Sequence, residues 1–317
     1  MVPPPSLACA LPAPPEGWHR LAASPLADGR IALLLADQDI EREFAKRRFG
    51  QRAGDPDALA RRARAEIWVY DGDSAVRAVG FDLGTPYPRF DRCPDGRWLV
   101  ASSRRRDAAD DARLIDAEGR VTGTLRLGDG IEHVQFDADG TVWCGWFDEG
   151  IFGNSDWSYP GREWPPSSAG LAAFDLAGTC LAEAPPSPDY GGIADCYVLN
   201  VTDGAAWACT YMGFPILRLE RSGAGHYCAT DLSGVRALAV RGVHVVTIGS
   251  YDRDRIPFTL LRIEQGEACV IAQGNLQTGR DTERRLPDMH GRGPWLHLIE
   301  DSQWQRWHID QLLAGNE

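Results

Sequence analysis

The sequence has almost no lysine and no sustained hydrophobic stretch. Lys46 is the only lysine and every other basic residue is arginine, a bias typical of coding sequences in GC-rich bacteria. No run of about 18 apolar residues occurs, which excludes a membrane-spanning helix. The N-terminal segment MVPPPSLACALPAPP has no basic leader and is interrupted by prolines. We therefore expect no signal peptide and a cytoplasmic protein.

The motifs of several enzyme classes are also missing. The eight cysteines contain no C-x-x-C pair, so we expect reduced thiols that act as small core hydrophobes. There is no G-x-S-x-G nucleophile elbow, no G-x-x-x-x-G-K phosphate loop, no Rossmann glycine pattern and no H-E-x-x-H. Nucleotide hydrolysis and hydride transfer are therefore disfavoured.

Positive charge is in deficit, since the formal net charge is −12 over 317 residues. Such a field disfavours non-specific binding to nucleic acid or to anionic membranes, and we expect neither as a partner. The length is compatible with one closed all-β domain. We expect a single domain over residues 1–317.

The sequence does contain a repeated pattern that is typical of a β-hairpin. Its clearest copy is Phe136–Trp146, in which Asp139-Gly140 separates two apolar runs and supplies the positive φ of a tight turn. Six copies occur, with turn glycines at Gly29, Gly96, Gly140, Gly204, Gly242 and Gly293. When the polar insertions 39–65 and 148–167 are set aside, the period is roughly 40 to 50 residues, the range of four-stranded propeller blades.

The pattern therefore predicts an all-β fold, a six-bladed β-propeller of four-stranded antiparallel blades. The sixth repeat lacks an outer strand, and the apolar segment Ser6–Leu11 has no other use. We expect this N-terminal strand to complete the sixth blade, because closure of the ring removes an exposed sheet edge. Residues 39–65 predict a small helical insertion in blade 1, with Asp39 and Asp55-Pro56 at the starts of two helices.

The motif F-D-A-D-G-T-V-W resembles that of six-bladed propellers of the senescence-marker/gluconolactonase and NHL-repeat kinds. The order WFDEGIFGN, GLAAFDLAG, IADCYVLN is also similar to a group of bacterial propeller proteins without a known activity. The first resemblance implies a divalent metal held in the central channel by a Glu, an Asn and an Asp. It covers only the repeated turns, and the three ligands are not aligned with residues of this chain.

Propeller wiring places both insertions on the face opposite the Asp-Gly turns, here called the top face. The insertion 39–65 and the adjacent loop with Arg104, Arg105 and Arg106 are rich in basic residues. These could bind an anionic ligand or a protein partner. The alternative is a solvated helix face with internal ion pairs.

The insertion 148–167 combines carboxylates, glycines and aromatic residues. Because disordered linkers are poor in aromatics, we expect an ordered loop that covers the channel mouth or forms a binding wall. The alternative is a packed structural loop. The ligand-binding candidates of this loop and of the neighbouring strand tops are Asn154, Trp157, Tyr159, Tyr211 and Tyr251.

Acidic residues cluster at the predicted tops of the strands. Four of them, Glu132, Asp148, Asp195 and Asp252, are candidate ligands of Ca²⁺ or Mg²⁺, since these ions prefer oxygen donors. His133 and Glu149 are candidate general bases. The alternative is that the acids pair with Arg89, Arg236, Arg253 and Arg255.

Two functions remain open from the sequence. The first is a propeller-type binding protein that recognises a small polar or anionic ligand, or a protein partner, on its top face. The second is a divalent-metal-dependent hydrolase or lactonase of the gluconolactonase-like kind. A propeller that has lost an ancestral activity is a third interpretation, because the fold itself does not decide.

Overall fold

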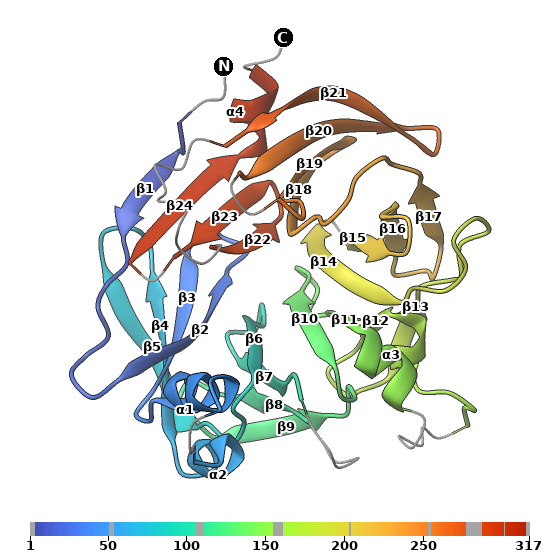
Figure 1. Cartoon of the computed structure of the whole chain (residues 1–317). Coiled ribbons are helices and arrows are strands. Elements are labelled where there is room, and N and C mark those ends of the chain that lie inside the picture. Colours follow the sequence, from blue (N-terminus) through green and yellow to red (C-terminus); the bar gives the residue numbers. More distant parts are fainter. Residues whose placement is uncertain are drawn as a thin grey trace.

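Six β-sheets surround a central axis in the computed structural model (Figure 1). The structure describes residues 4–50, 54–104, 111–154, 161–202, 204–252, 255–276, 287–300 and 302–314, and in α1 it describes only the backbone of residues 47 and 48. Each sheet has four antiparallel strands, and its strands follow one another in chain order in five of the six sheets. This is the predicted six-bladed propeller.

The strands of each blade are given from the channel outward. Blade 1 contains β2 (His19–Pro25), β3 (Ile31–Ala36), β4 (Arg64–Tyr70) and β5 (Ala75–Asp82). Blade 2 contains β6 (Pro88–Arg92), β7 (Trp98–Ser102), β8 (Ala112–Ile115) and β9 (Val121–Leu125). Blade 3 contains β10 (Ile131–Phe136), β11 (Val142–Trp146), β12 (Leu171–Phe174) and β13 (Cys180–Glu183).

The second half of the ring is built in the same way. Blade 4 contains β14 (Asp195–Thr202), β15 (Ala205–Tyr211), β16 (Ile216–Glu220) and β17 (Gly225–Cys228). Blade 5 contains β18 (Ala237–Arg241), β19 (His244–Ile248), β20 (Pro257–Glu264) and β21 (Glu267–Asn275). Blade 6 contains β22 (Asp288–Arg292), β23 (Trp295–Ile299), β24 (Gln303–His308) and β1 (Leu7–Ala10).

The N-terminal strand closes the ring, as the sequence predicts. β1 pairs antiparallel with β24, with Leu7 opposite Arg306 and Ala10 opposite Gln303. The apolar side chains of β1 and its flank pack with Trp304 and Tyr70 in one hydrophobic cluster. In Figure 1 the blue β1 lies beside the red β24, at the edge of blade 6.

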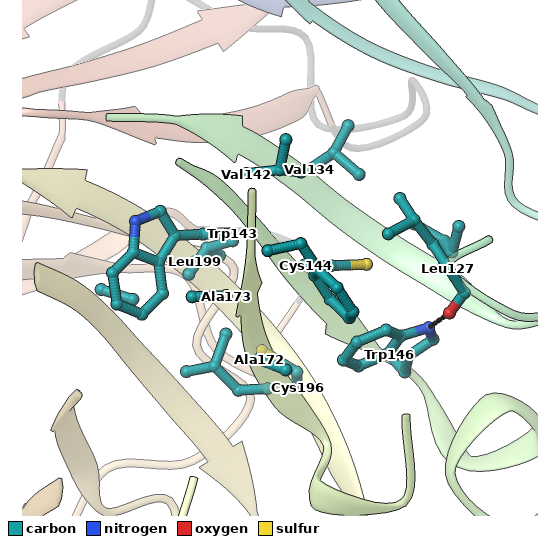
Figure 2. Close-up of a cluster of buried hydrophobic side chains, with 14 of the residues drawn as sticks. Leu127, Val134, Val142, Trp143, Cys144, Trp146, Ala172, Ala173, Cys196 and Leu199 are labelled. Carbon is teal, nitrogen blue, oxygen red and sulfur yellow. Dashed lines mark hydrogen bonds between the residues drawn. The ribbon is translucent and has the colours of Figure 1, made fainter. Parts of the chain in front are cut away.

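The hairpin Phe136–Trp146 shows how the repeated motif folds. Gly140 has φ of 84°, and all six turn glycines have positive φ. The Asp137 carboxylate accepts hydrogen bonds from the backbone of Asp139 and Thr141, both at 3.0 Å, and from the Trp143 indole at 3.1 Å. Figure 2 shows Trp143 and Trp146 in the core between blades, where the Trp146 indole donates to the Leu127 carbonyl at 3.1 Å. In this blade the turn is therefore tied to a buried tryptophan.

Two amide side chains cross the channel. Gln135 Nε2 donates to the carbonyls of Leu199 and Gly291, at 3.1 and 3.2 Å. Asn200, fully buried, donates through Nδ2 to the carbonyls of Leu238 and Gly293, at 2.7 and 2.9 Å. Blades 3 and 6 stand opposite each other, so the contact between Gln135 and Gly291 spans the axis. We call Gln135 and Asn200 the amide plug, and it separates a top mouth from a bottom mouth.

A buried ion pair reinforces the plug from below. Arg292 of blade 6 donates to the Phe136 carbonyl of blade 3 at 2.9 Å, and its Nη1 lies 3.0 Å from Asp91 Oδ2 of blade 2. Asp91 in turn accepts from the Phe136 backbone at 2.7 Å. Both charged side chains are almost fully buried.

Helices occur in the two predicted insertions and near the C-terminus. Blade 1 carries α1 (Ile40–Arg48) and α2 (Pro56–Ala60) between β3 and β4, and blade 3 carries α3 (Asp148–Gly153) and the 3-10 helix η2 (Pro166–Ala169) between β11 and β12. The last helix is α4 (Ile309–Ala314). None of the described helices is long and apolar enough to cross a membrane.

The starts of the first two helices follow from their capping residues. Asp39 accepts from the backbone N–H of Arg42 at 3.0 Å, and Asp55 accepts from that of Asp57 at 3.2 Å, with Pro56 at the first helical position. Both caps satisfy N–H groups that the helix leaves unpaired. The predicted helical insertion is confirmed.

Candidate functional site

Four carboxylates gather at the top mouth. Asp195 begins β14, Glu132 lies near the start of β10, and Asp148 and Glu149 open α3. Burial raises the pKa of Asp195 to about 7, and the nearby charges of Glu132, Asp148 and Glu149 add to the effect. Like charges must be close to act in this way. The structure therefore brings together three of the four predicted metal ligands and one predicted general base.

Two β-bulges shape this mouth. In blade 3, Ile131 pairs with Trp146 and His133 with Gly145, which leaves Glu132 as the extra residue. In blade 4, Cys196 pairs with Thr210 and Val198 with Cys209, which leaves Tyr197 as the extra residue. A bulge redirects the side chain of the residue it inserts. Equivalent bulges in adjacent blades thus position Glu132 and Tyr197.

Arginines neutralise part of the acidic cluster. Arg89 Nη2 lies 3.2 Å from Glu132 Oε2, and its Nε donates to the Glu132 carbonyl at 2.8 Å. Arg104 Nη2 lies 3.0 Å from Glu149 Oε1, and its guanidinium lies over the Phe147 ring at 4.4 Å. The sequence left open that the acidic residues pair with nearby arginines, and Arg89 does pair with Glu132.

Asp148 and Glu149 share a side-chain hydrogen bond that shifts their pKa values in opposite directions. The side-chain hydrogen bond with Glu149 raises the pKa of Asp148. The same contact, together with Arg104, lowers the pKa of Glu149. Asp195 and Asp148 consequently hold protons more tightly than ordinary aspartates, which is the behaviour of a site with surplus negative charge.

An aromatic cluster borders Asp195 directly. Tyr211 is the cross-strand partner of Asp195, and its ring stacks on Tyr197 with centroids 6.0 Å apart. Phe214 meets Tyr197, Tyr211 and Tyr251 edge to face at 5.1 to 6.1 Å. We call Tyr197, Tyr211, Phe214 and Tyr251 the tyrosine shelf. Tyr211 and Tyr251 are exposed, at 41% and 59%, so the shelf presents ring surface to solvent.

Two histidines line the channel wall below the carboxylates. His133 Nε2 lies 3.1 Å from the Tyr197 carbonyl, and because a carbonyl only accepts, this nitrogen carries the proton. Burial lowers the pKa of His133, and it lowers the pKa of His290 to about 4. Both rings are therefore neutral at pH 7.

The remaining predicted residues are placed as follows. Asn154 is buried, and its amide donates to the Asp129 carbonyl at 2.9 Å and to Ser167 Oγ at 3.0 Å, so it holds the insertion together. Asp252 follows Tyr251 in the loop after β19, and its backbone N–H donates to Ser250 at 3.1 Å. Four predicted ligand-binding residues lie outside the described residues: Arg105, Arg106, Trp157 and Tyr159.

A preformed metal centre is not visible in the described part of the chain. No group of three or more His, Cys, Asp or Glu side chains there is arranged to hold a metal ion. Likewise, no hydrogen bond joins the two predicted general bases, His133 and Glu149, within those residues. The carboxylates share a mouth but do not converge on one point.

Sequence reasoning missed Tyr197, Phe214 and His290 as members of the site. Tyr197 lies two residues after Asp195, and in a regular strand that spacing places both side chains on one face. Because Tyr197 is the extra residue of a bulge, this alternation does not hold at Tyr197. Nothing in the sequence marks Phe214, whose φ is 51°, as a neighbour of three tyrosines.

No protein-family model matches the sequence, and a search of curated proteins finds no match. Solved structures do resemble the fold. A chain of the mitotic checkpoint complex has a TM-score of 0.52 and 9% identity, covering 94% of this chain and 78% of that chain. Virginiamycin B lyase from Staphylococcus aureus has a TM-score of 0.49 and 12% identity, covering 90% and 79%. At such identities the likeness concerns the propeller fold alone.

Proposed function

We propose that this protein binds a small polar ligand at the top mouth of its propeller, and that the ligand carries a positive charge. The observation that carries the proposal is the position of the tyrosine shelf directly beside Asp195 and its three carboxylate neighbours. Aromatic faces and carboxylates together favour a cation over an anion or a neutral molecule.

The balance of charges at the top mouth favours a cationic ligand. Glu132 and Glu149 each have an arginine partner, whereas Asp195 has a pKa near 7 because it is half-buried among like charges. A bound cation relieves this repulsion and favours the ionised form of Asp195. The anionic ligand expected from the sequence rested on the basic residues of the insertion 39–65 together with Arg104, Arg105 and Arg106, and of these Arg104 is paired with Glu149.

The tyrosine shelf favours a ligand that has some apolar surface. Tyr197 and Tyr211 lie nearly parallel, with 11° between their planes, and the Tyr197 hydroxyl lies 3.4 Å from that of Tyr251. These contacts hold the rings in place before a ligand arrives. Preorganised aromatic surface contributes affinity at low entropic cost.

The test compares choline with its uncharged isostere 3,3-dimethyl-1-butanol, by titration calorimetry at pH 8. We expect choline to bind more tightly, and we expect its affinity to rise between pH 6 and pH 8 as Asp195 ionises. Tyr211→Ala and Asp195→Asn should each weaken choline about tenfold, in line with a cation–π or charge contact of roughly 1 to 2 kcal/mol.

Two variants serve as matched controls. Tyr87→Ala removes a partly exposed ring that stacks on Phe44 instead of the shelf. Glu118→Gln removes an exposed carboxylate that pairs with Arg120 on the opposite face. Both should leave choline affinity unchanged. Equal binding of the two probes, or equal loss in the control variants, would contradict the proposal.

The metal-dependent lactonase stays a prediction from the motif resemblance. No contact among the described residues favours it over ligand binding. Melting curves in calcium and in EDTA test it, because calcium at 100 times its dissociation constant should add about 2.7 kcal/mol of stability.

A further inference from the structure

The bottom mouth of the channel contains a cavity of its own. It measures about 700 Å³ and is lined by residues of all six blades, mostly from the turns between first and second strands. Ligand pockets commonly have about 300 to 1,000 Å³. The turns therefore do more than reverse the chain, since together they enclose a space large enough for a small molecule.

This cavity is separate from the top mouth. Arg292 lines it and donates to the Phe136 carbonyl at 2.9 Å, while the amide plug lies above, with Asn200 bound to the Gly293 carbonyl at 2.9 Å. Because these contacts cross the axis, a ligand at the bottom does not reach Asp195 or the tyrosine shelf. These contacts therefore separate the two mouths in space.

Three arginines from three blades contribute to the wall of this space. Arg92, Arg241 and Arg292 line the cavity. The guanidinium of Arg92 lies 5.8 Å from the Trp98 ring centroid, and within the described residues it has no ion-pair partner. Arg241 pairs with Asp310 at the rim, and its side chain is 57% exposed.

The acidic residues of the lining are already engaged. Asp28 accepts from Arg30 at 2.6 Å, and Asp137 from Arg221 at 2.7 Å. Neither Arg30 nor Arg221 belongs to the lining. Arg30 and Arg221 thus offset much of the negative charge in the wall from outside. Arg92, which lies near Asp28 but forms no ion pair within the described residues, and Arg241, whose exposed guanidinium has more donors than Asp310 uses, can still donate to a ligand.

Apolar groups form much of the rest of the wall. They include Leu26, Pro94, Phe136, Val201, Val240 and Pro294. A wall of apolar groups with a few convergent charged groups is typical of sites for small organic molecules.

We propose that the bottom cavity binds a small organic anion, with a carboxylate or phosphate group at Arg92 and Arg241 and an apolar body against Pro94, Phe136 and Pro294. Arginine suits either anion, because its planar donors match both in paired hydrogen bonds. Arg292, held by Asp91 and Phe136, fixes the inner end of the cavity.

Titrations of the full chain with benzoate and phenyl phosphate test this site and separate the two anions. Benzyl alcohol serves as the neutral comparison. We expect at least one anion to bind with an affinity that falls with salt, and the double variant Arg92→Gln/Arg241→Gln to lose about tenfold or more, as charge-assisted hydrogen bonds predict.

Two further variants make the result specific. Arg97→Gln removes an arginine of the same face that pairs with Asp95 and does not line the cavity, and it should bind normally. Ala138→Trp places a large ring in the cavity wall from an exposed turn position, so it should block binding while all arginines remain.

Two results would overturn the proposal. One is that neither anion binds the wild-type protein at millimolar concentration. The other is that both the double variant and Ala138→Trp bind as the wild type does. Asp195→Asn should leave anion binding unchanged, which distinguishes this cavity from the top mouth.

Discussion

Replacing Asp195 with asparagine should stabilise the protein at neutral and alkaline pH. In the unfolded chain this carboxyl ionises at its ordinary pKa of 3.8, but in the fold the pKa is about 7. The stability contributed by the protonated carboxyl is therefore fully present below pH 3.8 and is lost as pH rises through 7. Above pH 7 the folded protein carries the whole cost of the buried charge, and asparagine removes it.

The size of the effect follows from the pKa. A rise from 3.8 to about 7 corresponds to about 4 kcal/mol as an upper bound, at 1.36 kcal/mol for each pKa unit. Asp195 is only half-buried, so solvent screens the repulsion from Glu132, Asp148 and Glu149. We expect Asp195→Asn to raise the free energy of unfolding by about 1 to 2 kcal/mol at pH 8.

Urea unfolding followed by tryptophan fluorescence measures the difference in free energy of unfolding between the wild type and Asp195→Asn at pH 5.5, 6.5, 7.5 and 8.5. The advantage of Asp195→Asn should grow across this range and level off above pH 7.5. Glu118→Gln, an exposed carboxylate on the other face, should show no such trend. A difference that is constant with pH, or an asparagine variant that is less stable at pH 8.5, would refute the reasoning about the acidic cluster.

Three other variants probe the frame of the ring. Asn200→Ala leaves the Leu238 carbonyl and the Gly293 N–H without the partner that Asn200 supplies, whereas the Gly293 carbonyl keeps its bond from the Val240 N–H. The variant should cost about 2 to 4 kcal/mol in urea unfolding, and a loss below 1 kcal/mol would contradict the amide plug. Arg292→Met leaves the buried carboxylate of Asp91 without its ion-pair partner and should lower the free energy of unfolding by about 3 to 5 kcal/mol. Adding Asp91→Asn should recover part of this loss, and no recovery would argue against the ion pair. Deleting residues 1–12 removes β1 and should unfold or oligomerise the protein, a result that a monomer melting at the wild-type temperature would exclude.

The fold could be read from the sequence because its signals are local. Each Asp-Gly or Arg-Gly turn needs a positive φ, and each is followed by a strand with a buried face, so six copies predict six blades. The closing strand Leu7–Ala10 was predictable because the last repeat lacked a partner. The caps Asp39 and Asp55 similarly predicted the two helices of blade 1.

The candidate site was only partly predictable because its geometry depends on bulges. Alternation along a strand places residues by a period of two, and a bulge at Glu132 or Tyr197 breaks that period without a sequence marker. The pairing of Arg104 with Glu149 joins residues 45 positions apart in different blades. Such contacts depend on the whole ring, so strand patterns alone do not reveal them.

The pairing of β1 with β24 bears on how the chain is made in the cell. Ser6 Oγ donates to the carbonyl of Arg306, 300 residues later. At roughly 5 to 20 residues per second, the first strand waits on the order of 15 to 60 s for its partner to leave the ribosome. During this time β1 has no partner strand, and when β24 emerges it can pair equally well with the first strand of a second nascent copy. Dense polysomes should therefore favour strand-exchanged dimers, and slow, dilute expression should favour the closed monomer.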